Sequence, residues 1–328
     1  MSIKFTQFQP FKLLKIKLFM VCVLSFSAVS GQAESFRGLY EKALQEELQI
    51  LPLDEEKAQK YSWVFVTGFL NEAAGWVGTY FGDEVERLRE HHVSEDQIFV
   101  IRPSSSAAIE DNSEFLFEAL QKIHEETQRR LMVITHSKAS PEVLYMISQC
   151  PKESNGFIEQ VLTLHAAFGS QVADLFEGGN LKEKDGYLEL PFSQRLKIQV
   201  FQFARKFLNF WLADGVESLT LEAVDKIFSQ EVIQTLKEQG IPISFLRGAQ
   251  EQKDISSSMD ATHAYLSHFG PNDGMVVADR QYLLGVGTDL GIFDFDHADS
   301  IIEWPISNAS KDTRYALMDA MMMYLIRE

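Results

Sequence analysis

Short apolar segments that alternate with helical segments constrain the fold of this chain more than any other feature. The first of them, Ser62–Val66, ends at the turn residues Thr67-Gly68. Buried strands of parallel sheets look like this, because both of their faces are covered. The alternation predicts an α/β protein with a mostly parallel sheet flanked by helices. Further strands are expected at 97–101, 131–134 and 161–164, and helices at 83–90, at 113–127 and from about 140.

Helical sequence precedes and interrupts this pattern. Residues 34–58 are an amphipathic helical lead-in, and residues 172–237 are mostly helical and rich in aromatic residues. Strand-type sequence returns at 243–246 and at 291–295. We therefore expect one α/β domain over 59–328 with 172–237 inserted as a helical lid. The alternative is that the aromatic residues pack a helical subdomain. They are Phe201, Phe203, Phe207, Phe210 and Trp211.

Residues 1–33 have the composition of a secretory signal peptide. Their only charged residues are four lysines, and an apolar run from Leu18 to about Ser30 precedes the small and polar residues Gly31-Gln32-Ala33. This run is shorter than the roughly 20 residues that a membrane-spanning helix needs. The sequence therefore predicts export to the periplasm or the medium, and the alternative is an uncleaved membrane anchor. The four lysines are Lys4, Lys12, Lys15 and Lys17.

The charge of the remaining chain limits its partners. Without the four lysines, the chain has 26 basic and 47 acidic residues and therefore a formal charge of −21. Such a chain repels nucleic acid and anionic lipid, so we expect no nucleic-acid partner and a neutral substrate. Only Cys150 remains after cleavage, which excludes an intramolecular disulfide. The sequence holds no metal-binding cluster, P-loop or dinucleotide fingerprint, and we expect no cofactor, no metal and a monomer.

The strongest local signal is a serine between a strand and a helix. Leu131–Thr135 is apolar up to its last residue, and Ser137 follows immediately before a helix start. A tight strand–turn–helix bend presents such a hydroxyl at the carboxyl end of a sheet. The usual pattern is Gly-X-Ser-X-Gly, and here Thr135 and Ala139 replace both glycines. Alanine is small enough, whereas the branched Cβ of Thr135 is expected to crowd the neighbouring strand.

These residues resemble the α/β-hydrolase superfamily, in particular bacterial lipase- and esterase-like proteins with a Gly-His-Ser-Lys-Gly-Gly elbow. The resemblance spans about residues 60–328 and implies Ser137 as nucleophile, Asp273 as catalytic acid and His297 as base. We further expect peripheral contact with a lipid surface through the lid. The matching segments are His136–Ser140, the turn within Thr163–Asp174, Asn272–Val277 with its Asn-Asp-Gly, and Phe295–Asp299 with its Asp-His-Ala-Asp.

The order along the chain supports this assignment. Ser137, Asp273 and His297 follow the order Ser, Asp, His that this fold requires. Asn-Asp-Gly is also a common tight-turn sequence, so the alternative is that Asp273 only forms a turn and has no catalytic role. Its competitors as the acid are Asp260, Asp294, Asp296 and Asp299. Among the other histidines, we expect three to be solvated: His91, His92 and His124. His136 is expected to pack. His165, His263 and His268 are candidates for the base without supporting context in the sequence.

The developing oxyanion needs two N–H donors. Lys138, the residue after the nucleophile, supplies one through its backbone. By position, Phe69 supplies the other, because Thr67–Leu70 resembles the family's His-Gly-X loop; the alternative is that Gly68 only ends a strand. We therefore expect a serine hydrolase that cleaves carboxylic esters, such as an esterase or lipase. A catalytically degenerate binding protein and an acyltransferase or thioesterase with the same triad are the alternatives.

Overall fold

The computed structural model describes residues 34–69, 80–177, 181, 186–302 and 307–327, and of residues 201–213 only the backbone. The predicted signal peptide, residues 1–33, lies outside this part of the chain. Within it, no helix is both long and apolar enough to cross a membrane.

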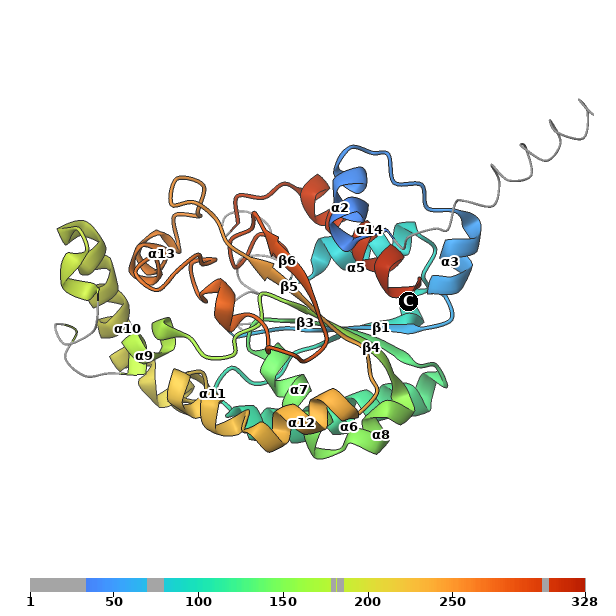
Figure 1. Cartoon of the computed structure of the whole chain (residues 1–328), viewed down its shortest axis with the longest axis horizontal. Helices are drawn as coiled ribbons and strands as arrows, with labels where there is room; N and C mark the ends of the chain where they lie inside the picture. Colours follow the sequence, from blue (N-terminus) through green and yellow to red (C-terminus); the bar gives the residue numbers. More distant parts are fainter. Residues whose placement is uncertain (1–33, 70–79, 178–180, 182–185, 303–306, 328) are drawn as a thin grey trace, which may run out of the picture.

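A parallel sheet of six strands forms the centre of the described chain (Figure 1). Its order is β2-β1-β3-β4-β5-β6, and every neighbouring pair is parallel. All six predicted strands are present, and their ends differ from prediction by at most three residues. The α/β class is therefore confirmed. The strands are β1 Ser62–Val66, β2 Ile98–Ile101, β3 Leu131–His136, β4 Ile158–Leu164, β5 Ile243–Gly248 and β6 Thr288–Phe293.

Helices cover both faces of the sheet (Figure 1). The layer drawn below it contains α6 Ile109–Thr127, α7 Ala139–Gln149, α8 Pro151–Phe157 and α12 Gln230–Glu238, and the layer above contains α2 Phe36–Leu44, α3 Pro52–Ala58, α5 Gly82–Glu90 and α14 Lys311–Leu325. The remaining helices are α9 Gln171–Glu177, α10 Phe192–Glu217, α11 Leu221–Ile227 and α13 Asp260–Leu266, with 3₁₀ turns at Glu95–Gln97, Tyr187–Glu189 and Ala278–Arg280.

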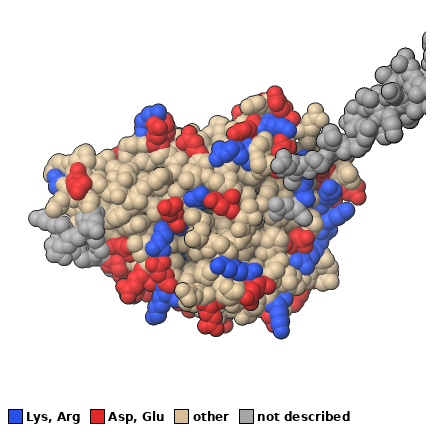
Figure 2. Space-filling view, in the orientation of Figure 1, with Lys and Arg blue, Asp and Glu red and all other residues tan. Residues whose placement is uncertain are grey.

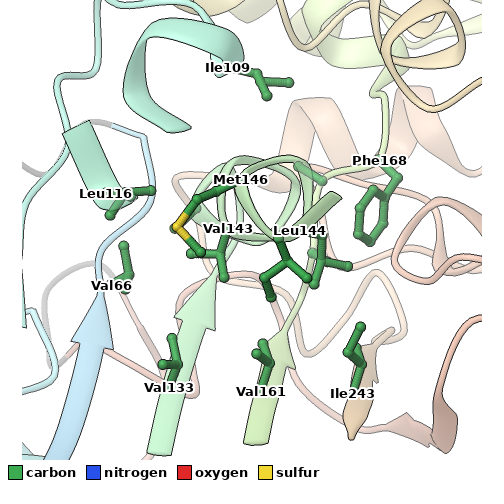
Figure 3. Packing of buried hydrophobic residues seen from close by; sticks show 14 of the residues in the cluster. Val66, Ile109, Leu116, Val133, Val143, Leu144, Met146, Val161, Phe168 and Ile243 are labelled. Atoms are coloured by element: carbon green, nitrogen blue, oxygen red, sulfur yellow. The ribbon is translucent and has the colours of Figure 1, made fainter. Parts of the chain in front are cut away.

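Alternate strand residues face the two layers, which explains the continuous apolar runs. Val133 of β3 packs with Val143 and Leu144 of α7 in the lower core, and Figure 3 shows strand side chains directed at that helix. The neighbouring Met132 and Ile134 belong to the upper core with α14. A strand covered on both faces needs apolar residues at every position, and β3 lies between β1 and β4 in the interior of the sheet.

The C-terminal helix α14 was not predicted. Every residue from Ala316 to Leu325 is buried, so the sequence has no polar face and no helical periodicity. The predicted helical lead-in 34–58 holds the two helices α2 and α3. Pro52 occupies the first position of α3, where its missing N–H is tolerated, and therefore starts a new helix.

The segment 172–237 divides into parts with different packing. Its last helix, α12, lies against α7, and Leu236 belongs to the lower core. This end of the segment is therefore part of the layer beneath the sheet. Helices α9 and α10 lie beyond the sheet, at the left of Figure 1. The side chains of the aromatic cluster at 201–211 lie outside the described part, and a lid function stays a prediction.

Candidate active site

Ser137 occupies a sharp bend between β3 and α7. Its φ of 57° is in the left-handed region, which costs a residue with a side chain roughly 1–2 kcal/mol. Backbone hydrogen bonds hold the bend, since Ser137 N donates to the Leu164 carbonyl (3.0 Å) and the Ser137 carbonyl accepts from Ala167 N (3.2 Å). The strained turn places the hydroxyl at the carboxyl end of the sheet, as the sequence pattern indicated.

The replaced glycines of the elbow are accommodated. The hydroxyl of Thr135 lies 2.8 Å from that of Ser140 in the first turn of α7, and both residues are fully buried. The branched side chain therefore points at the helix and forms a hydrogen bond there, and the expected crowding of the next strand is not observed. Ala139 is buried at the start of α7.

Gly68 lies against the elbow. A Cβ atom at this position would approach the Cβ of Ser137 to 2.7 Å and the carbonyl of His136 to 2.8 Å. No larger residue fits, so the interpretation of Gly68 as a plain strand-ending turn is incomplete. Phe69, the next residue, lines the same cavity as Ser137.

The side chains of Ser137, His297 and Asp273 form a continuous hydrogen-bonded row. His297 Nε2 lies 2.8 Å from Ser137 Oγ, and Nδ1 lies 2.7 Å from Asp273 Oδ2. The backbone supports the pair, because His297 N donates to the Asp273 carbonyl (2.8 Å). Oδ1 of Asp273 accepts hydrogen bonds from the N–H groups of Met275 (2.9 Å) and Val276 (2.7 Å). The Asn-Asp-Gly turn therefore also orients the carboxylate toward the imidazole.

An apolar cavity of about 270 Å³ opens onto this row. Ala173 and Phe176 of α9, Val216 of α10 and Met275 line it together with Ser137 and His297. No Lys, Arg, Asp or Glu is among its lining residues in the described chain. Such a cavity suits an uncharged, apolar group next to the serine.

Neither a family model nor a curated protein sequence matches this chain. Several solved structures, however, are similar to it. A metagenomic carboxyl esterase is 19% identical, with 81% of this chain and 76% of that chain covered and a TM-score of 0.59. The lipase BlEst2 of Bacillus licheniformis in its mature form is 20% identical, with 73% and 85% covered and a TM-score of 0.53.

This protein has the α/β-hydrolase fold. In this fold a nucleophile follows a central strand on a strained turn, and acid and base follow later in the chain. The described site has that arrangement, with Ser137 after β3, Asp273 after β5 and His297 after β6.

The buried surroundings of the hydrolase-fold site set its charges. Burial alone would raise the pKa of Asp273, but the imidazoles of His297 and His165 outweigh it and hold that pKa well below its usual range. Burial and the neighbouring imidazole of His297 lower the pKa of His136 well below its usual value. Burial likewise lowers the pKa of His165. The site therefore combines an ionised carboxylate with two neutral imidazoles around His297.

Two histidines near the site have more than the roles expected of them. His136 packs, as predicted, but it also lies 2.8 Å from the His297 carbonyl through Nε2. His165 is fully buried, and its Nδ1 lies 3.4 Å from Asp273 Oδ2. His165 lies in the resembling segment Thr163–Asp174, but the motif assigned it no role, because only the fold brings the end of β4 next to this turn.

The other histidines lie away from the serine. His91 was expected to be solvated, and this is wrong, because it is buried with Nε2 2.7 Å from Asp319 of the unpredicted helix α14. His124 is half-buried against the Arg129 carbonyl (2.7 Å), and His92 is exposed. His263 bonds to the side chain of Gln252. His268 lies beside Glu189.

The competing aspartates have other partners. Asp296 accepts hydrogen bonds from the N–H groups of Ala298 and Asp299 and stabilises the turn that carries His297. Asp299 accepts a hydrogen bond from Ser307, and Asp260 pairs with Lys197 on the surface. Asp294 is exposed.

His165, Asp273 and His297 are also a potential ligand set for a metal ion, since their ligand atoms lie within 4.8 Å of one another. The contact of 2.7 Å between His297 Nδ1 and Asp273 Oδ2 is a direct hydrogen bond. It leaves no room for an ion between these two atoms.

The side chain of Lys138 forms a buried ion pair that the sequence analysis missed. Its Nζ donates to Glu142 Oε1 (2.5 Å) and to the Ala107 carbonyl (2.8 Å), and Asn112 donates to the same carboxylate oxygen (2.6 Å). Burial raises the pKa of Glu142 to about 7 even though Lys138 opposes the shift. The i, i+4 spacing on α7 was visible, but such pairs are usually exposed. Here the pair ties the elbow to α6.

Proposed function

We propose that this protein is a serine hydrolase that cleaves carboxylic esters through a covalent acyl-enzyme. The observation that carries the proposal is the hydrogen-bonded row Asp273–His297–Ser137 at the mouth of an apolar cavity. The likeness to an esterase and a lipase is consistent with it, because those proteins have the same fold.

In the proposed reaction, His297 Nε2 takes the proton of Ser137 as Oγ attacks the ester carbonyl. Asp273 stabilises the imidazolium that forms and keeps its Nδ1–H directed at the carboxylate. The alcohol leaves with the proton from His297, and water then attacks the acyl-enzyme with His297 again as the base. His297 finally gives this proton to Ser137 Oγ as the carboxylic acid leaves, which restores the starting state.

The proposed donors to the oxyanion are the N–H groups of Phe69 and Lys138, each worth roughly 3 kcal/mol. Two features support them. The close approach of Gly68 to Ser137 brings the following residue to the nucleophile, and Lys138 lies at the N-terminus of α7, where backbone N–H groups favour negative charge.

The substrate class follows from the cavity and the surface. Without a charged lining residue in the described chain, the cavity suits the acyl group of a neutral ester. Leu188, Phe192, Leu196 and Val200 are exposed in and before the first turns of α10, and Figure 2 shows few charges at that end of the molecule. We propose that this apolar face contacts a lipid surface, and that an exported monomer is the active form.

Hydrolysis of p-nitrophenyl butyrate and octanoate tests the proposal, with the protein from residue 34 and its Ser137→Ala variant. Ser148→Ala on the same helix is the matched control, because its hydroxyl bonds only locally in the described structure, to the Tyr145 carbonyl and the Gln149 side chain. We expect activity in the wild type and the control and none in Ser137→Ala. A folded but inactive wild type would favour the degenerate binding protein. A higher kcat/KM on an octanoyl thioester would favour a thioesterase.

A further inference from the structure

Three hydrogen bonds join two parts of the proposed site, and the two side chains that form them, Tyr80 and His136, also line the cavity. Gly68 N lies 2.9 Å from the Tyr80 hydroxyl, and this hydroxyl lies 2.6 Å from His136 Nδ1. His136 Nε2 lies 2.8 Å from the His297 carbonyl. The chain of bonds therefore begins in the loop that carries Phe69 and ends on the backbone of the base.

The two ends of this chain fix the direction of its two outer hydrogen bonds, and the neutral state of His136 fixes the direction of the middle one. A backbone N–H only donates and a backbone carbonyl only accepts. Gly68 N–H thus donates to the Tyr80 oxygen, the Tyr80 O–H donates to His136 Nδ1, and His136 Nε2–H donates to the His297 carbonyl. This arrangement requires a neutral tyrosine and a neutral histidine.

The surroundings keep both groups neutral. Burial raises the pKa of Tyr80 far above its usual value. Burial and the imidazoles of His297 and His165 lower the pKa of His136. Tyr80 and His136 are at most 5% exposed, and this burial disfavours the charged form of each group.

We infer that Tyr80 and His136 are positioning residues. They hold the loop of Gly68 and Phe69, which carries a proposed oxyanion donor, at a fixed separation from the base His297. This inference rests on the proposed function. Catalytic groups must be held to within about 0.5 Å, and a displacement of about 1 Å costs on the order of a hundredfold in rate. Gly68 has no side chain to anchor the loop, and the hydroxyl of Tyr80, 12 residues further along the chain, takes this role.

The same bonds explain why a histidine precedes the nucleophile. Residue 136 is the last residue of β3, and its ring lies 4.7 Å from the ring of His297, centroid to centroid. A side chain here must accept a hydrogen bond from the Tyr80 hydroxyl at one atom and donate one to the His297 carbonyl from another. Neutral histidine does both.

The first test is Tyr80→Phe, which removes the hydroxyl and keeps the ring. We expect kcat on p-nitrophenyl butyrate to fall about 10- to 100-fold with KM within about threefold, because the groups that act in the transition state lose their alignment. Tyr324→Phe is the control. It also removes a buried hydroxyl, one that bonds to Ser244 in β5 and does not line the cavity. A fall in stability without a fall in kcat is expected for the control.

The second test compares His136→Gln with His136→Leu. Glutamine carries an N–H close to the position of Nε2 and can still donate to the His297 carbonyl, whereas leucine cannot. We expect His136→Gln to recover most of the kcat that His136→Leu loses. This comparison remains valid even where Tyr80→Phe fails to fold.

The outcomes separate the two proposals. An inactive wild type overturns the proposed function before the variants are considered. An active wild type with Tyr80→Phe equal in kcat to Tyr324→Phe, or with His136→Gln and His136→Leu equally active, overturns the positioning role alone.

Discussion

The exchange Asp273→Asn tests the path of protons through the site, because it keeps the shape of the side chain. Oδ1 of Asp273 accepts from the N–H groups of Met275 and Val276, and Oδ2 faces His297 Nδ1 at 2.7 Å. An asparagine must leave its oxygen on the two backbone donors, since an NH₂ group cannot accept a hydrogen bond. Its NH₂ group then faces Nδ1 of His297.

This amide donor forces His297 into the wrong tautomer. Nδ1 becomes an acceptor, so the ring proton sits on Nε2 and points at Ser137 Oγ, 2.8 Å away. The imidazole can then no longer take the proton of the serine. In serine proteases the same exchange lowers kcat about 10⁴-fold, which is about 5.5 kcal/mol in activation free energy. We expect a fall of that size with KM nearly unchanged, because Asp273 does not line the cavity.

The assay is kcat for p-nitrophenyl butyrate, with Asp319→Asn as the matched control. Asp319 is also a buried carboxylate 2.7 Å from a histidine, but in the layer of α5 and α14. We expect the control to lose stability and keep kcat. A folded Asp273→Asn protein that retains more than about a tenth of the wild-type kcat would refute the reasoning, because the tautomer argument requires a far larger loss.

Three further predictions concern the elbow, the cavity and a buried acid. Lys138→Met leaves Glu142 buried without its ion-pair partner and is expected to lower the free energy of unfolding by about 3–5 kcal/mol, measured in urea, while adding Glu142→Leu restores most of it. Ala173→Leu fills the cavity and is expected to lower the ratio of kcat/KM on octanoate to butyrate more than about tenfold, at about 0.8 kcal/mol per methylene displaced. Burial raises the pKa of Glu84 to about 8, so the folded chain keeps a proton that the unfolded chain has already lost. Stability is therefore expected to fall between about pH 5 and pH 8 by about 1.4 kcal/mol per pH unit, and Glu84→Gln should remove this dependence.

Each of these predictions has a contrary result. A double variant at 138 and 142 that is no more stable than Lys138→Met would show that the two residues do not act as a pair. Equal octanoate-to-butyrate ratios in wild type and Ala173→Leu would place the acyl group outside the cavity. Unfolding curves of wild type and Glu84→Gln that change in parallel with pH would exclude Glu84 as the source of the dependence.

The sheet was predictable from the sequence because its strands are covered on both faces. Val133 faces one helical layer and Ile134 the other, so the whole strand is apolar. Helix α14 was not predictable for the same reason, since burial on every side erases the periodicity of 3.6 residues. Without α14 no partner for His91 was visible, and the expectation that His91 is solvated was wrong.

The residues of the proposed site were predictable where a local motif carries them. Ser137 follows a strand directly, and Asp273 and His297 lie in short segments that resemble known ones. No local motif assigns a role to Tyr80 or His165, because their contacts join segments far apart in the chain. The hydroxyl of Tyr80 reaches a ring 56 residues away. Such contacts depend on the order of the strands, which the pattern of elements does not specify.

The most direct test of the central claim is labelling with a fluorophosphonate, followed by peptide mapping in a mass spectrometer. Only a serine with an activated hydroxyl reacts readily with this reagent. We predict a single adduct on the peptide that contains Ser137, and its loss in His297→Ala although the serine is still present. A folded protein that remains unlabelled, or that carries the adduct on another residue, would contradict the account.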